Sequence, residues 1–285
     1  MTFIDFIKLC RPQQYYKNLL IFLPLIFVGE LFQRNAQILS VIGFICLCFI
    51  SSSNYVLNDI FDRKRDKIHP EKKDRPIASG RITIMQGIIF SLLLFFIGTS
   101  IGLYLDFFFF LFLLALFFLT LSYSLYFKKQ PFADIMVIGI NFVLRASSGV
   151  FLLKAVMSPW LILCTFFLSL FLSVSKRAGD LQLLGAKAAA HKEVLAYYTH
   201  DITNALMTIS TTLLIVSYSL YSYLGQYHEL IYTLPFALYT IFRYFFLVQS
   251  GSEISRHPEK VYKDMQMVVG MFLWLLSVVL ILYFT

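Results

Sequence analysis

The sequence predicts an all-α membrane protein, a polytopic bundle of about nine transmembrane helices with a cytoplasmic N-terminus. The 285-residue chain is 59% hydrophobic and only 14% charged. Apolar runs of about 17 to 25 residues, the length that a helix needs to cross a bilayer, follow one another along it. So apolar a chain must be solvated by lipid, and we expect residues 1–285 to form a single transmembrane domain.

The expected spans follow the apolar runs in order. They are residues 19–33, 37–57, 83–105, 107–126, 132–153, 159–175, 202–224, 231–249 and 265–284. Thr83 and Gln86 predict a capping box at the start of the third run. Pro131 and Pro159 stand where a first helical residue is expected.

Basic residues gather in every second connection, whereas the intervening connections carry almost only Arg34 and Lys154. The positive-inside rule then places the N-terminus in the cytoplasm and the C-terminus outside. The net charge of +8 reflects this topology, because the cations do not form one stripe, and we expect no nucleic-acid partner.

A ladder of polar residues ends the second run. Asn54, Asn58, Asp62 and Asp66 recur every four positions and therefore share one side of a helix. Clustered carboxylates at a membrane boundary repel one another unless a cation separates them. Mg²⁺ takes one or two protein carboxylates together with substrate phosphate oxygens, so the ladder is suited to a magnesium-bound diphosphate. The alternative is a solvated helix end whose acids pair with nearby Arg and Lys.

The loop that follows, residues 67–81, is rich in turn-forming residues and cations. Lys72, Lys73 and Arg75 are candidates for contacts to phosphate oxygens, and Arg is favoured where the contact is bidentate. Attraction to anionic lipid explains each of these cations equally well.

A second cluster occupies the next cytoplasmic connection and consists of Tyr123, Tyr126, Lys128 and, in the following run, Asp134. Asp134, Asn141 and Arg145 are seven and four residues apart, so a helix presents all three on the same side. An intramembrane arginine is costly unless it faces a polar cavity or a partner, which makes Arg145 a candidate site residue. The alternative is a structural pair between Arg145 and Asp134 or the backbone.

The third cluster is Ser175-Lys176-Arg177-Ala-Gly-Asp180, at the cytoplasmic end of the sixth run. It brings one carboxylate and two cations to the same side of the membrane as the acidic ladder. A plain basic stop beside the membrane is the alternative interpretation.

Together these residues resemble the UbiA superfamily of intramembrane transferases, and more closely its branch that transfers phosphoribose to a polyprenyl phosphate. The superfamily motif NxxxDxxxD is present as Asn58, Asp62 and Asp66, whereas the second motif, usually DxxxD, begins here with Lys176 and keeps only Asp180. The other matching segments are Arg11–Asn18, Arg75–Gly80, Tyr123–Lys128 and Phe242–Tyr244 with Pro258-Glu259.

The resemblance implies a nine-helix fold and attack by a membrane-held polyprenyl phosphate on 5-phosphoribosyl-1-diphosphate, with release of pyrophosphate. It implies that Asn58, Asp62 and Asp66 hold Mg²⁺, and that Asn58 also orients the diphosphate. Asp134 and Asp180 would bind ribose hydroxyls or assist the metal. The expected substrate contacts are Lys17, Arg75, Tyr123, Tyr126, Lys128, Arg145, Lys176 and Arg177.

Two other functions stay open at this stage. A prenyltransferase acting on an aromatic acceptor would use the same first motif to ionise a prenyl diphosphate, although Lys176 in place of an acid argues against it. A transporter would distribute polar residues through the depth of the bilayer, whereas here they crowd one end of the helices. The sequence shows no organelle-targeting segment, which favours a bacterial-type plasma membrane with a cytoplasmic active site.

Overall fold

The computed structural model describes residues 3–68, 72–185, 188 and 192–284, and within these residues every regular element is a helix. Eight helices of the described chain are long and apolar enough to cross a membrane. The all-α membrane fold is therefore confirmed. The count of nine spans and the cytoplasmic N-terminus stay predictions.

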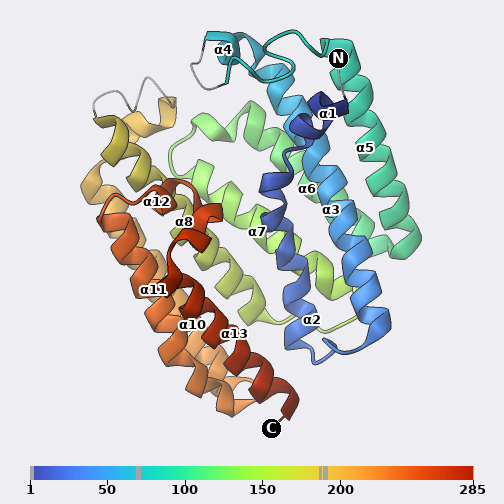
Figure 1. The fold of residues 1–285 in the computed structure, drawn as a ribbon. Helices are drawn as coiled ribbons and strands as arrows, with labels where there is room; N and C mark the ends of the chain where they lie inside the picture. Colours follow the sequence, from blue (N-terminus) through green and yellow to red (C-terminus); the bar gives the residue numbers. More distant parts are fainter. Residues whose placement is uncertain (1–2, 69–71, 186–187, 189–191, 285) are drawn as a thin grey trace. The chain divides into compact units, whose positions relative to one another are not determined.

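The chain divides into two compact units, whose helices are labelled in Figure 1. Unit 1 comprises residues 1–127 and 144–156, and unit 2 comprises residues 128–143 and 157–285. Helix α7, Ala133–Leu152, contributes its first half to unit 2 and its second half to unit 1.

Unit 1 is built on the long helix α3, which packs against α5 and α6. Its helical elements follow one another in chain order. They are α1 (Phe3–Cys10), η1 (Pro12–Phe22), α2 (Leu23–Phe27), α3 (Arg34–Phe61), α4 (Arg63–Ile68), α5 (Ile84–Leu105) and α6 (Phe107–Leu125).

The first apolar run is not a regular α-helix. It begins as the 3₁₀ helix η1 directly after Arg11, which has a left-handed backbone, and continues as α2. A 3₁₀ helix rises about 2.0 Å per residue and an α-helix about 1.5 Å, so η1 and α2 together extend about 30 Å, the thickness of a hydrocarbon core. The first half of this length carries Gln13, Gln14, Lys17 and Asn18, and residues 19–27 are its apolar part, so the ninth span stays a prediction. Gly149 of α7 lets η1 come close, because a Cβ there would lie 2.3 Å from the carbonyl oxygen of Ile21.

Small side chains hold α3 against α5. The Ser53 hydroxyl donates to the carbonyl of Ser91 (2.9 Å), and the Ser91 hydroxyl donates to the carbonyl of Ser53 (3.0 Å). Gly98 lets the two backbones approach, since a Cβ there would lie 3.3 Å from the Cys46 carbonyl oxygen. Lipid tails are as apolar as side chains, so close packing and such hydrogen bonds, each about 0.6 kcal/mol, are what favour helix association.

Capping residues start most of these helices where the sequence predicts. The capping box of Thr83 and Gln86 is present at the start of α5. The Asp106 carboxylate accepts from the amide of Phe109 (2.8 Å) and so separates α5 from α6. Pro159 is the first residue of its helix, whereas α7 begins two residues after Pro131.

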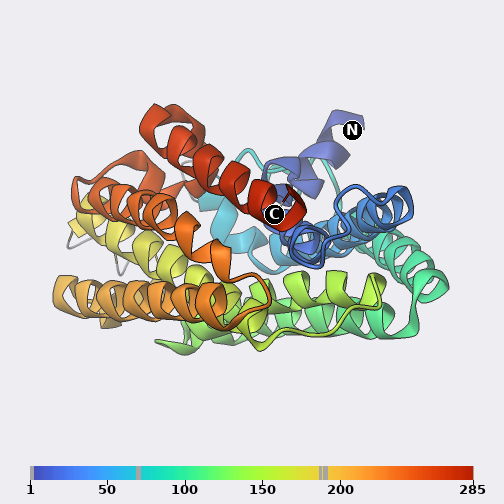
Figure 2. The same ribbon diagram turned by 90° about the horizontal axis from the view of Figure 1, so that it is seen from below.

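Unit 2 is organised around α8, which runs beside α10 (Figure 2). α8 extends from Pro159 to Leu184, nine residues beyond the predicted end at 175. The remaining elements of unit 2 are η2 (Phe127–Lys129, which begins at the unit boundary), η4 (Glu193–Tyr197), α10 (His200–Leu224), η5 (His228–Thr233), α11 (Leu234–Gln249), α12 (Glu253–Arg256), η6 (Pro258–Lys263) and α13 (Met265–Phe284).

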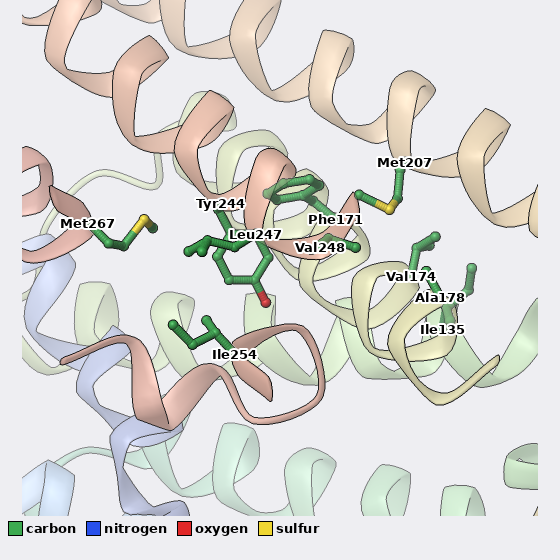
Figure 3. Packing of buried hydrophobic residues seen from close by; sticks show 10 residues of the cluster. All are labelled: Ile135, Phe171, Val174, Ala178, Met207, Tyr244, Leu247, Val248, Ile254 and Met267. Atoms are coloured by element: carbon green, nitrogen blue, oxygen red, sulfur yellow. The ribbon is translucent and has the colours of Figure 1, made fainter. Parts of the chain in front are cut away.

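The core of unit 2 joins six helices. Ile135 of α7, Met207 of α10 and Met267 of α13 pack around residues of α8, α11 and α12 (Figure 3). The rings of Phe171 and Tyr244 meet edge to face, with their centroids 5.3 Å apart. Ile254 of the short α12 belongs to this core, so the connection between α11 and α13 is fixed to the bundle.

Candidate active site

Asp59 is the centre of an ion-pair network in unit 1. It lies in the last turn of α3, and its side chain is only 3% exposed. The guanidinium of Arg11, just before η1, donates to its Oδ1, and Nη1 of Arg75 lies 3.0 Å from the same oxygen. The carboxylate therefore ties the N-terminal segment and the loop after α4 to the end of α3.

The acidic ladder keeps its helical spacing although α3 ends at Phe61. The amide of Asp62 donates to the Asn58 carbonyl (2.9 Å), and the amide of Asp66 donates to the Asp62 carbonyl (2.8 Å). Asn58 and Asp62 are half-buried, while Asp66, in α4, is 2% exposed. Backbone hydrogen bonds from residue i+4 to residue i thus connect the three predicted metal-binding residues in successive helical turns.

Arg75 Nη1 bridges two carboxylates, because it lies 2.7 Å from Asp66 Oδ2 and 3.0 Å from Asp59 Oδ1. Lys72 is half-buried beside it. Burial and the positive charge of Arg75 lower the pKa of Lys72, although Asp66 and Asp62 oppose the shift. This end of unit 1 thus carries three acids, Asp59, Asp62 and Asp66, that interact with several cations.

The arrangement fits a divalent cation that shares its ligands with a phosphate. Nη1 of the Arg75 guanidinium contacts oxygens of two separate carboxylates, as a metal cation would. Within the described residues, no three acidic, histidine or cysteine side chains form a complete cage for a metal. Mg²⁺ does not require such a cage, because it keeps waters and takes phosphate oxygens.

A second polar group of unit 1 surrounds Arg145. Arg145 is 6% exposed, and its Nε donates to Asn18 Oδ1 of η1 (2.9 Å). The same oxygen accepts from Ser51 (3.3 Å), and the Asn18 amide donates to Cys48 Sγ (3.4 Å). Of the predicted alternative, the pair between Arg145 and Asp134 is wrong, and a pair between Arg145 and the backbone stays a prediction. Eleven residues along one α-helix separate Arg145 from Asp134 by about 16 Å.

Asp134 is completely buried in unit 2 and fully hydrogen-bonded. Its Oδ2 accepts from Nε (3.0 Å) and Nη2 (2.8 Å) of Arg177 in α8, and its Oδ1 accepts from the hydroxyl of Tyr198 (2.7 Å). Burial and this bond raise the pKa of Tyr198 well above its usual range. With 0% exposure, Asp134 is placed to orient Arg177, and this geometry favours that role over direct contact with a substrate.

Asp180 lies one turn after Lys176 on α8 and is surrounded by cations. Nζ of Lys192 is 2.5 Å from its Oδ2, and Nε of Arg256 is 3.8 Å from its Oδ1. Burial, followed by the positive charge of Arg177, lowers the pKa of Lys192 to about 8, although Asp180 opposes the shift. Asp180 therefore belongs to a cationic cluster and has no acidic neighbour at the position that Lys176 occupies.

The remaining predicted residues are spread over both units. Lys17 lies on η1 with its Nζ 5.7 Å from the Tyr16 ring centre. Tyr123, on α6, is half-buried, and Tyr126, just after α6, is 60% exposed. Lys128, in η2, is half-buried.

Four charged residues belong to these clusters although the sequence did not predict them as site residues. They are Arg11, Asp59, Lys192 and Arg256. One signal existed for Asp59, because Asp59, Asp62 and Asp66 follow the i, i+3, i+7 spacing of one helix face. The two cations near Asp180 come from distant segments, and no local pattern marks them.

The model of the UbiA prenyltransferase family matches residues 20–283 of this sequence. The chain belongs to this family. The match covers the acidic ladder and the cations around Asp180, so the resemblance expected from Asn58, Asp62 and Asp66 is confirmed over nearly the whole chain.

Two curated relatives are decaprenyl-phosphate phosphoribosyltransferases. The protein of Mycolicibacterium smegmatis is 28% identical over 98% of this chain and 92% of its own length. The protein of Corynebacterium glutamicum is 28% identical over 97% of this chain and 86% of its own length. The similarity thus extends through both units.

Solved structures share the fold. A UbiA homologue of Archaeoglobus fulgidus, determined with GPP and Mg²⁺ bound, superposes with a TM-score of 0.73 over 95% of this chain and 99% of its own. The sequences are 16% identical. At this identity the likeness shows the fold alone.

Proposed function

We propose that the protein transfers 5-phosphoribose from 5-phosphoribosyl-1-diphosphate to a polyprenyl phosphate and releases pyrophosphate. The observation that carries this proposal is the similarity, along almost the whole chain, to two decaprenyl-phosphate phosphoribosyltransferases. The cationic surroundings of Asp180 support it, because a donor and an acceptor that both carry phosphate need several positive partners.

The reaction forms a bond between an acceptor phosphate oxygen and ribose C1, and it breaks the bond from C1 to the diphosphate. Positive charge develops at the anomeric centre and negative charge on the leaving group, so catalysis consists mainly of positioning and electrostatic stabilisation. No strong general base is required, since a phosphate monoester is already anionic near neutral pH.

The acidic ladder is the proposed metal site. Asn58, Asp62 and Asp66 would hold Mg²⁺, which neutralises charge on the diphosphate when bound. Arg75 is positioned to exchange its bonds with Asp59 and Asp66 for bonds to phosphate oxygens, for which a guanidinium is well suited. Asp59 would then still be paired with Arg11.

Other residues are proposed to bind phosphate or to support those that do. Lys17, Lys128, Lys176 and Arg177 are candidates for donor and acceptor phosphates, and Arg177 is oriented by the buried Asp134. Tyr123, Tyr126 and Arg145 remain proposed substrate contacts. We also propose that the protein lies in a bacterial-type plasma membrane with this chemistry on the cytoplasmic side, as the distribution of Lys and Arg implies.

The test offers the purified protein two substrate pairs in detergent with Mg²⁺. One tube contains 5-phosphoribosyl-1-diphosphate and a mass-tagged polyprenyl phosphate, and the other contains a prenyl diphosphate and an aromatic acid. A phosphoribosylated lipid that disappears with EDTA is the expected product. A prenylated aromatic would refute the assignment and favour the prenyltransferase alternative, for which the fold shared with the GPP-bound homologue is the supporting observation.

Lys176 distinguishes the two chemistries within one chain. It stands where the superfamily motif usually has an acid, and Lys176→Asp restores that acid. We expect this substitution to raise KM for the phosphoribosyl donor by about tenfold or more, because it replaces a charge-assisted contact to phosphate by repulsion. Unchanged kinetics would remove Lys176 from the phosphate site.

A further inference from the structure

Three cations from separate segments of unit 2 surround the carboxylate of Asp180. Lys176 lies one turn earlier on α8, Lys192 directly precedes η4, and Arg256 ends α12. Lys192 and Arg256 contact Asp180 at 2.5 and 3.8 Å. Both lie outside the membrane-spanning helices, so two connecting segments converge on the end of α8.

Close packing of α12 on α8 fixes Arg256 in this position. A Cβ on Gly179 would lie 2.3 Å from Ser255 Oγ and 2.9 Å from Arg256 Cγ. Ser255 and Ile254 are 1% and 5% exposed, so α12 is seated in the core of the unit. The glycine directly before Asp180 thus allows α12 to pack close to α8, and the Arg256 side chain reaches the carboxylate from there.

The cluster has more positive than negative charge. Asp180 is the acid that both Lys192 and Arg256 contact. Glu259 is the next acid, which accepts a hydrogen bond from His257 (3.1 Å) and interacts electrostatically with Lys176. Arg177 is engaged by Asp134. Three cations against two carboxylates leave a net positive charge on the described part of this site.

The cations are also open to a ligand. The side chain of Lys176 is exposed, and those of Lys192 and Arg256 are 33% and 27% exposed, whereas Asp180 itself is 9% exposed. A Lys ammonium has three donors and a guanidinium has five, so the cluster presents more N–H groups than one carboxylate can accept. A phosphate monoester, with three terminal oxygens and a charge of about −1.5 to −2, matches this excess.

We propose that Lys176, Lys192 and Arg256 bind a phosphate monoester, and that Asp180 is a positioning residue that holds Lys192 and Arg256 together. This inference rests on the proposed function, which supplies two such groups: the 5′-phosphate of the donor and the terminal phosphate of the lipid acceptor. A single carboxylate already shared by cations is a poor metal ligand, so this cluster binds phosphate directly.

The first experiment compares Lys192→Ala and Arg256→Ala with two matched controls. Lys129→Ala removes a cation that pairs with Glu193, next to Lys192, and Lys260→Ala removes one that pairs with Glu253 of α12. Initial rates are measured against the donor at saturating lipid, and against the lipid at saturating donor. We expect KM for one substrate to rise about tenfold or more in the two cluster variants, and both controls to behave like the wild type.

The substrate whose KM rises identifies the source of the phosphate. The role of Asp180 is tested by Asp180→Asn and Asp180→Glu. Loss of a positioning carboxylate raises the same KM with a smaller change in kcat, and the glutamate variant restores part of it. Unchanged KM values for both substrates in Lys192→Ala and Arg256→Ala would overturn the proposal while leaving the proposed function intact.

A second experiment does not depend on turnover. Ribose 5-phosphate is titrated into the detergent-solubilised wild type and variants, and binding is followed by the shift in thermal unfolding. A shift lost in Lys192→Ala and Arg256→Ala but kept in both controls supports the site even if no phosphoribosyl transfer is found. An equal shift in all five proteins, with no change in either KM, refutes it.

Discussion

Replacing Asp134 by leucine isolates the energetic contribution of the buried ion pair in unit 2. Asp134 is 0% exposed and the Arg177 side chain 6% exposed, so solvent cannot replace the lost carboxylate. Removing one partner of such a pair costs about 3 to 5 kcal/mol, because the other charge stays buried without its counter-ion. This free energy already includes the lost hydrogen bond from Tyr198, since Asp134, Arg177 and Tyr198 form one network.

The double variant Asp134→Leu/Arg177→Met provides the internal control. Exchanging both members of a buried ion pair for apolar residues is often neutral or stabilising, so the double variant should regain most of the stability lost by Asp134→Leu. It should not regain transfer activity, because Arg177 is a proposed phosphate contact.

Stability is measured as the free energy of unfolding in mixed micelles with increasing sodium dodecyl sulfate, followed by circular dichroism. Transfer activity is measured on the same samples before denaturant is added. A loss below about 1 kcal/mol for Asp134→Leu would mean that the pair is solvated or dispensable. A double variant less stable than the single one would refute the reasoning from burial.

Three further outcomes are expected. Asp62→Ala and Asp66→Ala should each abolish transfer while the circular dichroism spectrum stays that of a folded helical protein; near-normal turnover would remove their metal role. The lowered pKa of Lys192, about 8, means that its charge is lost as pH rises through 8, so substrate binding should weaken there, and Lys192→Arg should move this alkaline fall to higher pH. Gly179→Ala should displace α12 and raise the KM that depends on Arg256 several-fold, which the same initial-rate assay detects.

The sign of the pH effect differs for stability and for binding. The unfolded lysine stays charged up to about pH 10.4, so between pH 8 and 10.4 the folded state binds fewer protons than the unfolded state. Lys192 therefore makes the folded protein more stable as pH rises through this window. Phosphate binding, which needs the charged lysine, becomes weaker over the same range. Burial is the largest cause of the lowered pKa, and Arg177, Asp180 and Lys176 are the charged groups that act on it.

Hydropathy and charge in the sequence predict the helices well, because lipid solvation acts on each run separately. The spans from α3 to α13 appear within a few residues of their predicted ends, apart from the extension of α8 and the 3₁₀ turn η5 before α11. Hydropathy does not predict the 3₁₀ geometry of the first run, since it measures composition and not helical pitch. Pro12 and the left-handed Arg11 start η1 well before residue 19.

Ion pairing was predicted less well, because a periodic pattern identifies a face but not the residue opposite it. Asp59 pairs with Arg11, which is 48 residues away in the sequence, and Asp134 pairs with Arg177, which is 43 residues away. The ladder of Asn58, Asp62 and Asp66 could be predicted since its order is local. The cations around Asp180 depend on how two connections fold back, which the sequence does not reveal.

The bond between Arg145 and Asn18 has a consequence for biosynthesis. The two residues are 127 positions apart, so at ordinary rates of translation Asn18 leaves the ribosome on the order of ten seconds before Arg145. Inserting an arginine near the middle of a helix costs about 2.5 to 3.5 kcal/mol. α7 therefore meets the membrane at a disadvantage that η1 and α3 relieve, and the early helices have to remain beside the insertion machinery until the Arg145 segment arrives.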